Sequence, residues 1–167
     1  MLEIIEAKTK ENFSIVRKLF EEYADSLEID LAFQNHEQEL AGLEFIYGPP
    51  VGALFLALWE GSPAGCIGLK KLDRLTCEMK RLYVKPEARG RGIGETLCRR
   101  IIKKAKELGY KQMRLDTLPS MSAAQTLYGK LGFKKIEPYY HNPYPGATYM
   151  ELTLQSSFKL LNNPEPK

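Results

Sequence analysis

Hydrophobic and polar positions alternate with two different periods at the start of the chain. Residues 2–7 alternate weakly in the manner of a strand, and the apolar positions that follow Thr9 recur at helical spacing. Threonine is a favoured helix N-cap because its hydroxyl accepts a hydrogen bond from a free backbone amide. The pattern therefore predicts a strand followed by an amphipathic helix. The apolar positions of this helix are Phe13, Val16, Phe20, Tyr23 and Leu27.

A more polar stretch between residues 31 and 50 follows. Helical spacing extends from about His36 to Phe45 and stops at Gly48-Pro49-Pro50, because proline lacks the amide hydrogen that a helix or a central strand requires. We predict that this stretch forms a lid or wall beside a site.

The middle of the chain contains three segments that predict strands. Residues 51–59 and 64–72 are separated by a four-residue turn, which is the pattern of a buried hairpin, and residues 76–84 add a third strand. Farther on, strands and helices alternate. The predicted elements are a helix at 94–108, a strand at 112–117, a helix at 122–131 and a strand at 149–154. Together they predict an α/β fold of the α+β kind, with a mixed, mostly antiparallel sheet and helices on both faces.

Composition limits the kind of protein that this chain can be. Its 167 residues, 44% hydrophobic and 27% charged, suit a single domain over residues 1–155 with a polar tail over residues 156–167. A net charge of +3 from 24 basic and 21 acidic residues is too balanced for a nucleic-acid binder. The first residues show no basic region followed by an apolar stretch, and no later run is long and apolar enough to span a bilayer, so we predict a cytoplasmic protein without membrane contact.

Cysteine and histidine usage gives no sign of a disulfide framework or a zinc site. The three cysteines have no paired spacing, and the chain has two histidines. We predict no metal and interpret the cysteines as buried structural residues, with a covalent acyl-cysteine as the less favoured alternative. The cysteines are Cys66, Cys77 and Cys98.

A glycine-rich segment joins the third strand to the best-defined helix. Gly90, Gly92 and Gly94 allow several backbone amides to converge on one anion at the helix N-terminus, and Arg89 and Arg91 add positive charge. The segment lacks the lysine of a P-loop and the third glycine of a dinucleotide fingerprint. It predicts a site for a phosphate-type group, with a simple connecting turn as the alternative.

Three blocks, in this order and spacing, resemble the GNAT superfamily of N-acetyltransferases. They are Glu78-Met79-Lys80-Arg81-Leu82-Tyr83-Val84-Lys85-Pro86, Arg89-Gly90-Arg91-Gly92-Ile93-Gly94, and Ala124-x-x-Leu127-Tyr128-x-x-Leu131-Gly132-Phe133. The resemblance is clearest from about residue 64 to residue 133. It implies the acyl-CoA N-acyltransferase fold, with acetyl-CoA as co-substrate and direct transfer of the acetyl group to a primary amine.

The resemblance also implies how the coenzyme is bound. Amides of the glycine-rich loop would hold the pyrophosphate, and the strand at 76–84 would splay from the strand at 112–117 at a bulge, which leaves main-chain groups free for the pantetheine arm. Family members often have asparagine where this chain has Met121, so side-chain contact there falls to Ser120 or Ser122. The implied coenzyme-binding residues are Leu82, Tyr83, Val84, Arg89, Gly90, Arg91, Gly92, Ile93, Gly94 and Glu95.

Two residues are implied to carry out the chemistry. An alkylamine has a pKa of about 10, so its attack on a thioester requires a base, and an acid eases the departure of the thiolate. The resemblance assigns the base to Glu78 and the acid to Tyr128. The alternatives are a salt-bridged strand glutamate and a core tyrosine.

The acceptor is predicted to be a small-molecule or peptide amine. Tyr139, Tyr140 and His141 begin an aromatic, turn-rich segment that we predict to form the acceptor pocket with the stretch around Phe33 to Pro50, ordinary loop packing being the alternative. A homodimer is compatible with the sequence. Two rival functions remain: a non-catalytic acyl-CoA-binding or regulatory module, and a protein-interaction domain with a vestigial loop.

Overall fold

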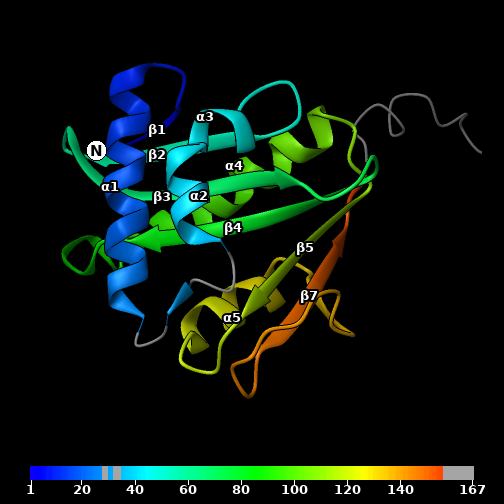
Figure 1. Cartoon of the computed structure of the whole chain (residues 1–167). Coiled ribbons are helices and arrows are strands. Elements are labelled where there is room, and N and C mark those ends of the chain that lie inside the picture. The colour runs from blue at the N-terminus through cyan, green and yellow to red at the C-terminus, as the bar shows by residue number, and fades with distance from the viewer. Residues whose placement is uncertain (28–29, 32–34, 156–167) are drawn as a thin grey trace, which may run out of the picture.

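The computed structural model describes residues 1–27, 30–31 and 35–155, and in this part the strands form one seven-stranded sheet (Figure 1). The strand order is β1-β2-β3-β4-β5-β7-β6, and every neighbouring pair is antiparallel except β4 with β5. The predicted mixed, mostly antiparallel sheet is therefore confirmed. The strands are β1 Leu2–Glu6, β2 Ala53–Trp59, β3 Ser62–Lys71, β4 Thr76–Val84, β5 Gln112–Thr117, β6 Lys134–Ile136 and β7 Thr148–Thr153.

Helices cover both faces of this sheet, as predicted, with α1 to α3 in front of it and α4 behind it in Figure 1. Thr9 caps α1, since its hydroxyl accepts a hydrogen bond from the Asn12 amide at 3.1 Å. The apolar stripe of each long helix is buried against the sheet, which gives one core cluster on each face. The helices are α1 Lys10–Ser26, α2 His36–Ala41, α3 Leu43–Ile46, α4 Ile93–Glu107 and α5 Ser122–Lys130, with a 3₁₀ turn at Pro86–Ala88.

Some details differ from the prediction. The helix expected over residues 36–45 is interrupted at Gly42 and forms α2 and α3. Strand β6 is not among the predicted strands, because its three residues, Lys-Lys-Ile, have a single apolar position. Its strand conformation depends on pairing with β7. Phe33 and the predicted tail, residues 156–167, lie outside the described residues. Among the helices that are described, none is long and apolar enough to cross a membrane.

The feature that positions the site is the separation of β4 from β5. Their parallel pairing covers residues 76–78 with residues 112–114 only, and the two strands then diverge (Figure 1). On its other edge β4 stays paired with β3 as far as Val84. The sheet therefore opens into a V between the carboxyl ends of β4 and β5.

Candidate active site

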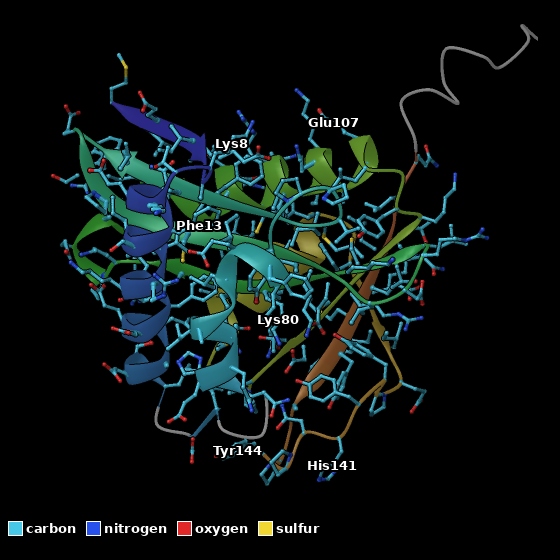
Figure 2. All side chains as sticks on the ribbon, turned by 45° about the horizontal axis from the view of Figure 1, so that its top comes forward. Lys8, Phe13, Lys80, Glu107, His141 and Tyr144 are labelled. Atoms are coloured by element: carbon cyan, nitrogen blue, oxygen red, sulfur yellow. The ribbon has the colours of Figure 1, made fainter. Side chains whose placement is uncertain are left out.

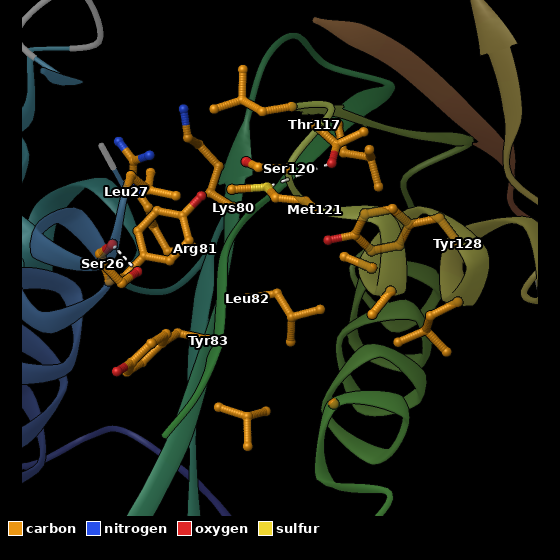
Figure 3. A pocket seen from close by; sticks show the side chains of 18 of the residues that line it. Ser26, Leu27, Lys80, Arg81, Leu82, Tyr83, Thr117, Ser120, Met121 and Tyr128 are labelled. Carbon is orange, nitrogen blue, oxygen red and sulfur yellow. Dashed lines mark hydrogen bonds between the residues drawn. The ribbon is translucent and has the colours of Figure 1, made fainter. Parts of the chain in front are cut away.

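A cavity of about 620 Å³ occupies this opening, with the end of α1 on one side and α5 on the other (Figure 3). The volume lies in the range of ligand-binding pockets. Of the residues that the sequence assigns to a site, its wall contains Leu82, Tyr83, Val84, Arg89, Gly94, Ser120, Ser122 and Tyr128. The others lie outside the wall: Glu78, Gly90, Arg91, Gly92, Ile93, Glu95, Tyr139, Tyr140 and His141.

Strand β4 enters the cavity through a bulge. Cys66 pairs with Tyr83 and Gly68 pairs with Lys80, so two residues of β4, Arg81 and Leu82, lie opposite one residue of β3. Arg81 has a φ of 58°, in the left-handed region. The bulge changes the direction of the side chains: Arg81 reaches Glu39 of α2, whereas Leu82 packs against the core cluster that contains α4.

The bulge and the divergence of β5 together expose one edge of the β4 main chain. The Lys85 amide donates to Ala64 of β3 at 2.8 Å. Because the N–H and C=O groups of successive strand residues point to alternate edges, those of Leu82 and Val84 point to the edge that β5 has left. The Val84 carbonyl there accepts a hydrogen bond from Arg89 Nε at 3.0 Å. The splay and bulge that the resemblance implied are thus present.

The glycine-rich loop ends at the N-terminus of α4. Gly92 is the N-cap with a φ of 75°, no side chain caps the helix, and the first amide with an acceptor inside the helix is that of Thr96, at 3.1 Å from the Gly92 carbonyl. The preceding first-turn amides are the ones that a helix leaves without intrahelical partners. A side-chain Cβ at Gly90 or Gly92 would meet open space. The loop therefore presents free amides and positive dipole charge to a bound anion.

Charged side chains around this loop are partly engaged. Arg91 donates to the Glu87 carbonyl at 2.8 Å and lies over the Trp59 ring at 4.9 Å. Glu95 pairs with Lys130 and Arg99, at 2.9 Å and 3.0 Å, and hydrogen bonds from these two side chains lower the pKa of its carboxyl. The negative charge of Glu95 at the helix N-terminus is thereby compensated.

Tyr128 of α5 is 7% exposed, and its hydroxyl points into the space between α5 and β4 in Figure 3. No hydrogen-bond partner for this hydroxyl occurs within the described part of the chain. Burial in the first place, and then the neighbouring Cys98 thiol, raises the pKa of the phenol well above its usual range. Near neutral pH Tyr128 is therefore a protonated donor that faces the cavity.

Two carboxylates lie near the point where β4 and β5 separate, in different surroundings. Glu78 of β4 is 3% exposed, accepts a hydrogen bond from the Tyr139 hydroxyl at 2.5 Å and lies 3.6 Å from Lys80 Nζ. Asp116 of β5 belongs to the cavity wall and accepts hydrogen bonds from the Tyr140 hydroxyl and, at 3.3 Å, from Asn142 Nδ2. Asp116 is not among the site residues predicted from the sequence, and the signal that points to it is a carboxylate on the strand expected to splay.

The predicted acceptor segment reaches the site through its hydroxyl and amide groups. Tyr139 and Tyr140 are half-buried, with ring centroids 5.4 Å apart, and each bonds one of the two carboxylates. His141 is exposed at the rim of the molecule, whereas Lys80 lies in the interior (Figure 2). Asn142 is the residue of this segment that the wall contains. None of residues 35–50 belongs to the wall, and α2 contacts the wall residue Arg81 through Glu39.

The three cysteines are buried. Burial raises the pKa of Cys66, and it raises the pKa values of Cys77 and Cys98 to about 12. A thiol of this kind is uncharged near neutral pH and is a poor nucleophile. Across the described ranges no group of three His, Cys, Asp or Glu side chains could hold a metal ion.

The sequence of this chain is similar to those of known N-acetyltransferases. The sequence model of the Acetyltransferase (GNAT) family matches residues 14–133. An uncharacterised N-acetyltransferase of Schizosaccharomyces pombe is 41% identical over 155 residues, which cover 92% of this chain and 95% of that protein.

Two solved structures illustrate the fold. A GNAT-family acetyltransferase of Staphylococcus aureus Mu50 superimposes with a TM-score of 0.77 at 22% identity, over 93% of this chain and all of that one. A Salmonella typhimurium structure with its cofactor acetyl-CoA superimposes with a TM-score of 0.70 at 17% identity, over 99% of this chain and 98% of that one. With the family match over residues 14–133, the nearly full-length yeast relative and this shared fold, the chain belongs to the GNAT family of N-acetyltransferases.

Proposed function

We propose that this protein transfers an acetyl group from acetyl-CoA to a primary amine by direct attack within a ternary complex. The observation that carries the proposal is the cavity itself, which combines the exposed edge of β4, a residue of the glycine-rich loop, and the Tyr128 hydroxyl in one space. The Salmonella structure with acetyl-CoA supports the choice of co-substrate.

The coenzyme would extend along two elements of the V. Its pyrophosphate would bind the first-turn amides of α4, where the helix dipole and the loop arginines favour negative charge. Its pantetheine arm would bond the main-chain groups of Leu82 and Val84 much as an added strand bonds a sheet edge. This path brings the thioester to the space that Tyr128 faces.

In the chemical step, the amine nitrogen attacks the thioester carbonyl carbon. An N–H of the exposed β4 edge, at Leu82 or Val84, would donate to the acyl oxygen as negative charge develops on it. Collapse of the intermediate breaks the carbon–sulfur bond, and the departing thiolate takes the Tyr128 proton. The nitrogen loses its second proton to solvent as the amide forms, and Tyr128 takes a proton back from solvent, so the products are the acetylated amine and coenzyme A.

The acceptor ammonium must lose a proton before it attacks. Asp116 belongs to the cavity wall and Glu78 does not, so we assign this proton to Asp116, directly or through one water. Glu78, the base that the sequence resemblance implies, stays the competing assignment because it lies near the same strand separation and bonds Tyr139. Variants of the two carboxylates distinguish these assignments.

The acceptor would enter from the side of the cavity where Ser26, Asp116 and Asn142 contribute polar groups. This wall suits a small-molecule or peptide amine that can place its nitrogen next to a carboxylate.

Thiol release from acetyl-CoA tests the function. The purified protein is incubated with acetyl-CoA and a panel of amines, amino acids, polyamines and peptides, and free thiol is followed over time. We expect release that depends on both enzyme and acceptor for one class in the panel. Tight binding of acetyl-CoA with only solvent-rate release throughout would contradict the proposal and favour a non-catalytic binding module.

A further inference from the structure

A buried ion pair connects α2 to the bulge of β4. Arg81 Nε donates to Glu39 Oε1 at 2.8 Å, and Nη2 lies 3.3 Å from Oε2. The Tyr47 hydroxyl donates to the same Oε2 at 2.7 Å. Glu39 and Arg81 are each 5% exposed, and Tyr47 is 1% exposed. Two-point contact with a planar guanidinium fixes its orientation as well as its position.

The bulge is held at a second point by Cys66. The Cys66 thiol donates to the Arg81 carbonyl at 3.6 Å, where the pairing of β3 with β4 skips a residue. Arg81 itself has a φ of 58°, a conformation that an L-residue with a side chain adopts only at an energetic cost. Such a conformation persists where the surroundings determine it, and here Glu39 and Cys66 hold its two ends.

The bulge determines which groups of β4 face the coenzyme side of the cavity. Without the extra residue, the side chains and main-chain groups after Arg81 would point to the opposite face or edge. Glu39 contacts Arg81 but does not belong to the cavity wall. Its effect on the site must therefore pass through Arg81.

We propose that Glu39 is a positioning residue that, through Arg81, fixes the β4 bulge and so aligns Leu82 and Val84 for the pantetheine arm of the coenzyme. The inference rests on the proposed function, since it needs acetyl-CoA as the ligand. It assigns α2 a role in coenzyme alignment that is separate from the pyrophosphate loop at the N-terminus of α4.

Two ligands that share the pyrophosphate but differ in the arm test this role. Calorimetry measures the Kd of acetyl-CoA and of 3′-phospho-ADP, which has the nucleotide part alone, for the wild type and for Glu39→Gln. We expect acetyl-CoA binding to weaken about tenfold and 3′-phospho-ADP binding to change less than about twofold. The matched control is Glu6→Gln, which removes a carboxylate paired with Lys104 at 2.9 Å, away from the cavity. It should change neither Kd.

A milder variant guards against misfolding of Glu39→Gln. Tyr47→Phe removes one hydrogen bond to Glu39 and keeps the ion pair, so we expect a smaller, equally selective loss of acetyl-CoA affinity. If both ligands bind more weakly by the same factor, or if acetyl-CoA binding is unchanged in both variants, the positioning role of Glu39 is wrong and the proposed function still stands. A wild-type protein that binds 3′-phospho-ADP and acetyl-CoA equally overturns it as well, and a wild type that binds neither overturns the proposed function with it.

Discussion

Tyr128 is the residue whose surroundings most directly suit a chemical role, because its buried hydroxyl faces the cavity. We predict that Tyr128→Phe lowers kcat by about a hundredfold and leaves the acetyl-CoA Kd within about twofold, since the proton matters when the thiolate leaves. Steady-state kinetics and calorimetry measure the two quantities. The matched control is Tyr110→Phe, which removes a hydroxyl that bonds the Val51 carbonyl at 2.6 Å outside the cavity. Unaltered turnover in Tyr128→Phe would remove this tyrosine from the mechanism.

The two carboxylates can be separated by their pH dependence. If Asp116 takes the amine proton, the ratio of wild-type to Asp116→Asn activity grows as the pH falls, because an alkylamine with a pKa of about 10 becomes ever more fully protonated. Glu78→Gln should lower activity by a factor that is nearly constant with pH. Values of kcat/KM measured from about pH 6 to about pH 9 for both variants show which carboxylate is the base. The opposite pattern would restore Glu78 as the base.

At the scale of elements, the two ends of α4 allow the effect of backbone strain to be distinguished from the effect of ligand contact. Gly92 precedes the helix at the proposed pyrophosphate site, and Gly109 follows it. Gly92 and Gly109 have positive φ values of 75° and 88°, and a Cβ at either would meet open space. Replacing either glycine by alanine should therefore lower the free energy of unfolding by about 1 kcal/mol. Only Gly92→Ala should also weaken acetyl-CoA binding, by about tenfold, because strain at the N-cap would move the first-turn amides of α4 that we propose to bind the pyrophosphate. Thermal unfolding and calorimetry check both values, and equal affinities in the two variants would argue against the loop as the pyrophosphate site.

The order of the strands and helices around the site was predictable, whereas the bulge was not. The sequence from β4 through the loop to α4 gives strong local signals: a strand ended by a proline, alternate glycines and a helical stripe. Nothing in Arg81 signals a positive φ, because the conformation depends on Glu39, which lies 42 residues away in the sequence. Asp116 was not predicted although it is a carboxylate on the strand expected to splay, because strand alternation does not show which residue of β5 lies beyond its last pair with β4.

At the scale of the whole molecule, the Glu39–Arg81 pair links stability to pH. Burial would raise the pKa of Glu39, but the Arg81 charge and hydrogen bonds outweigh it, so the pKa is lowered. A lowered carboxyl pKa gives stability that is present above the unfolded value of about 4.5 and is lost as the pH falls through the folded value. The Tm gap between wild type and Glu39→Gln should therefore be largest near neutral pH and narrow below about pH 4.5. A gap that stays constant down to acid pH would contradict this coupling.

The layered fold itself followed from patterning, since the apolar faces of α1 and α4 and the continuous apolar runs of β2 and β3 allow few arrangements other than helices on both faces of one sheet. The cavity could not be predicted from this patterning, because its walls come from segments that are distant in sequence: the end of α1, β4, the end of β5, and α5. Family resemblance supplied the expected splay, and tertiary contacts supplied the residues that face it.

Transfer of the acetyl group is the central claim, and an isotope label follows it most directly. The protein is mixed with acetyl-CoA labelled in the acetyl group and with the amine panel, and mass spectrometry locates the label. The account predicts label in an N-acetylated acceptor at a rate that matches thiol release, with an unmodified protein chain. Label found only in free acetate, or retained on a cysteine of the protein, would contradict direct transfer to an amine.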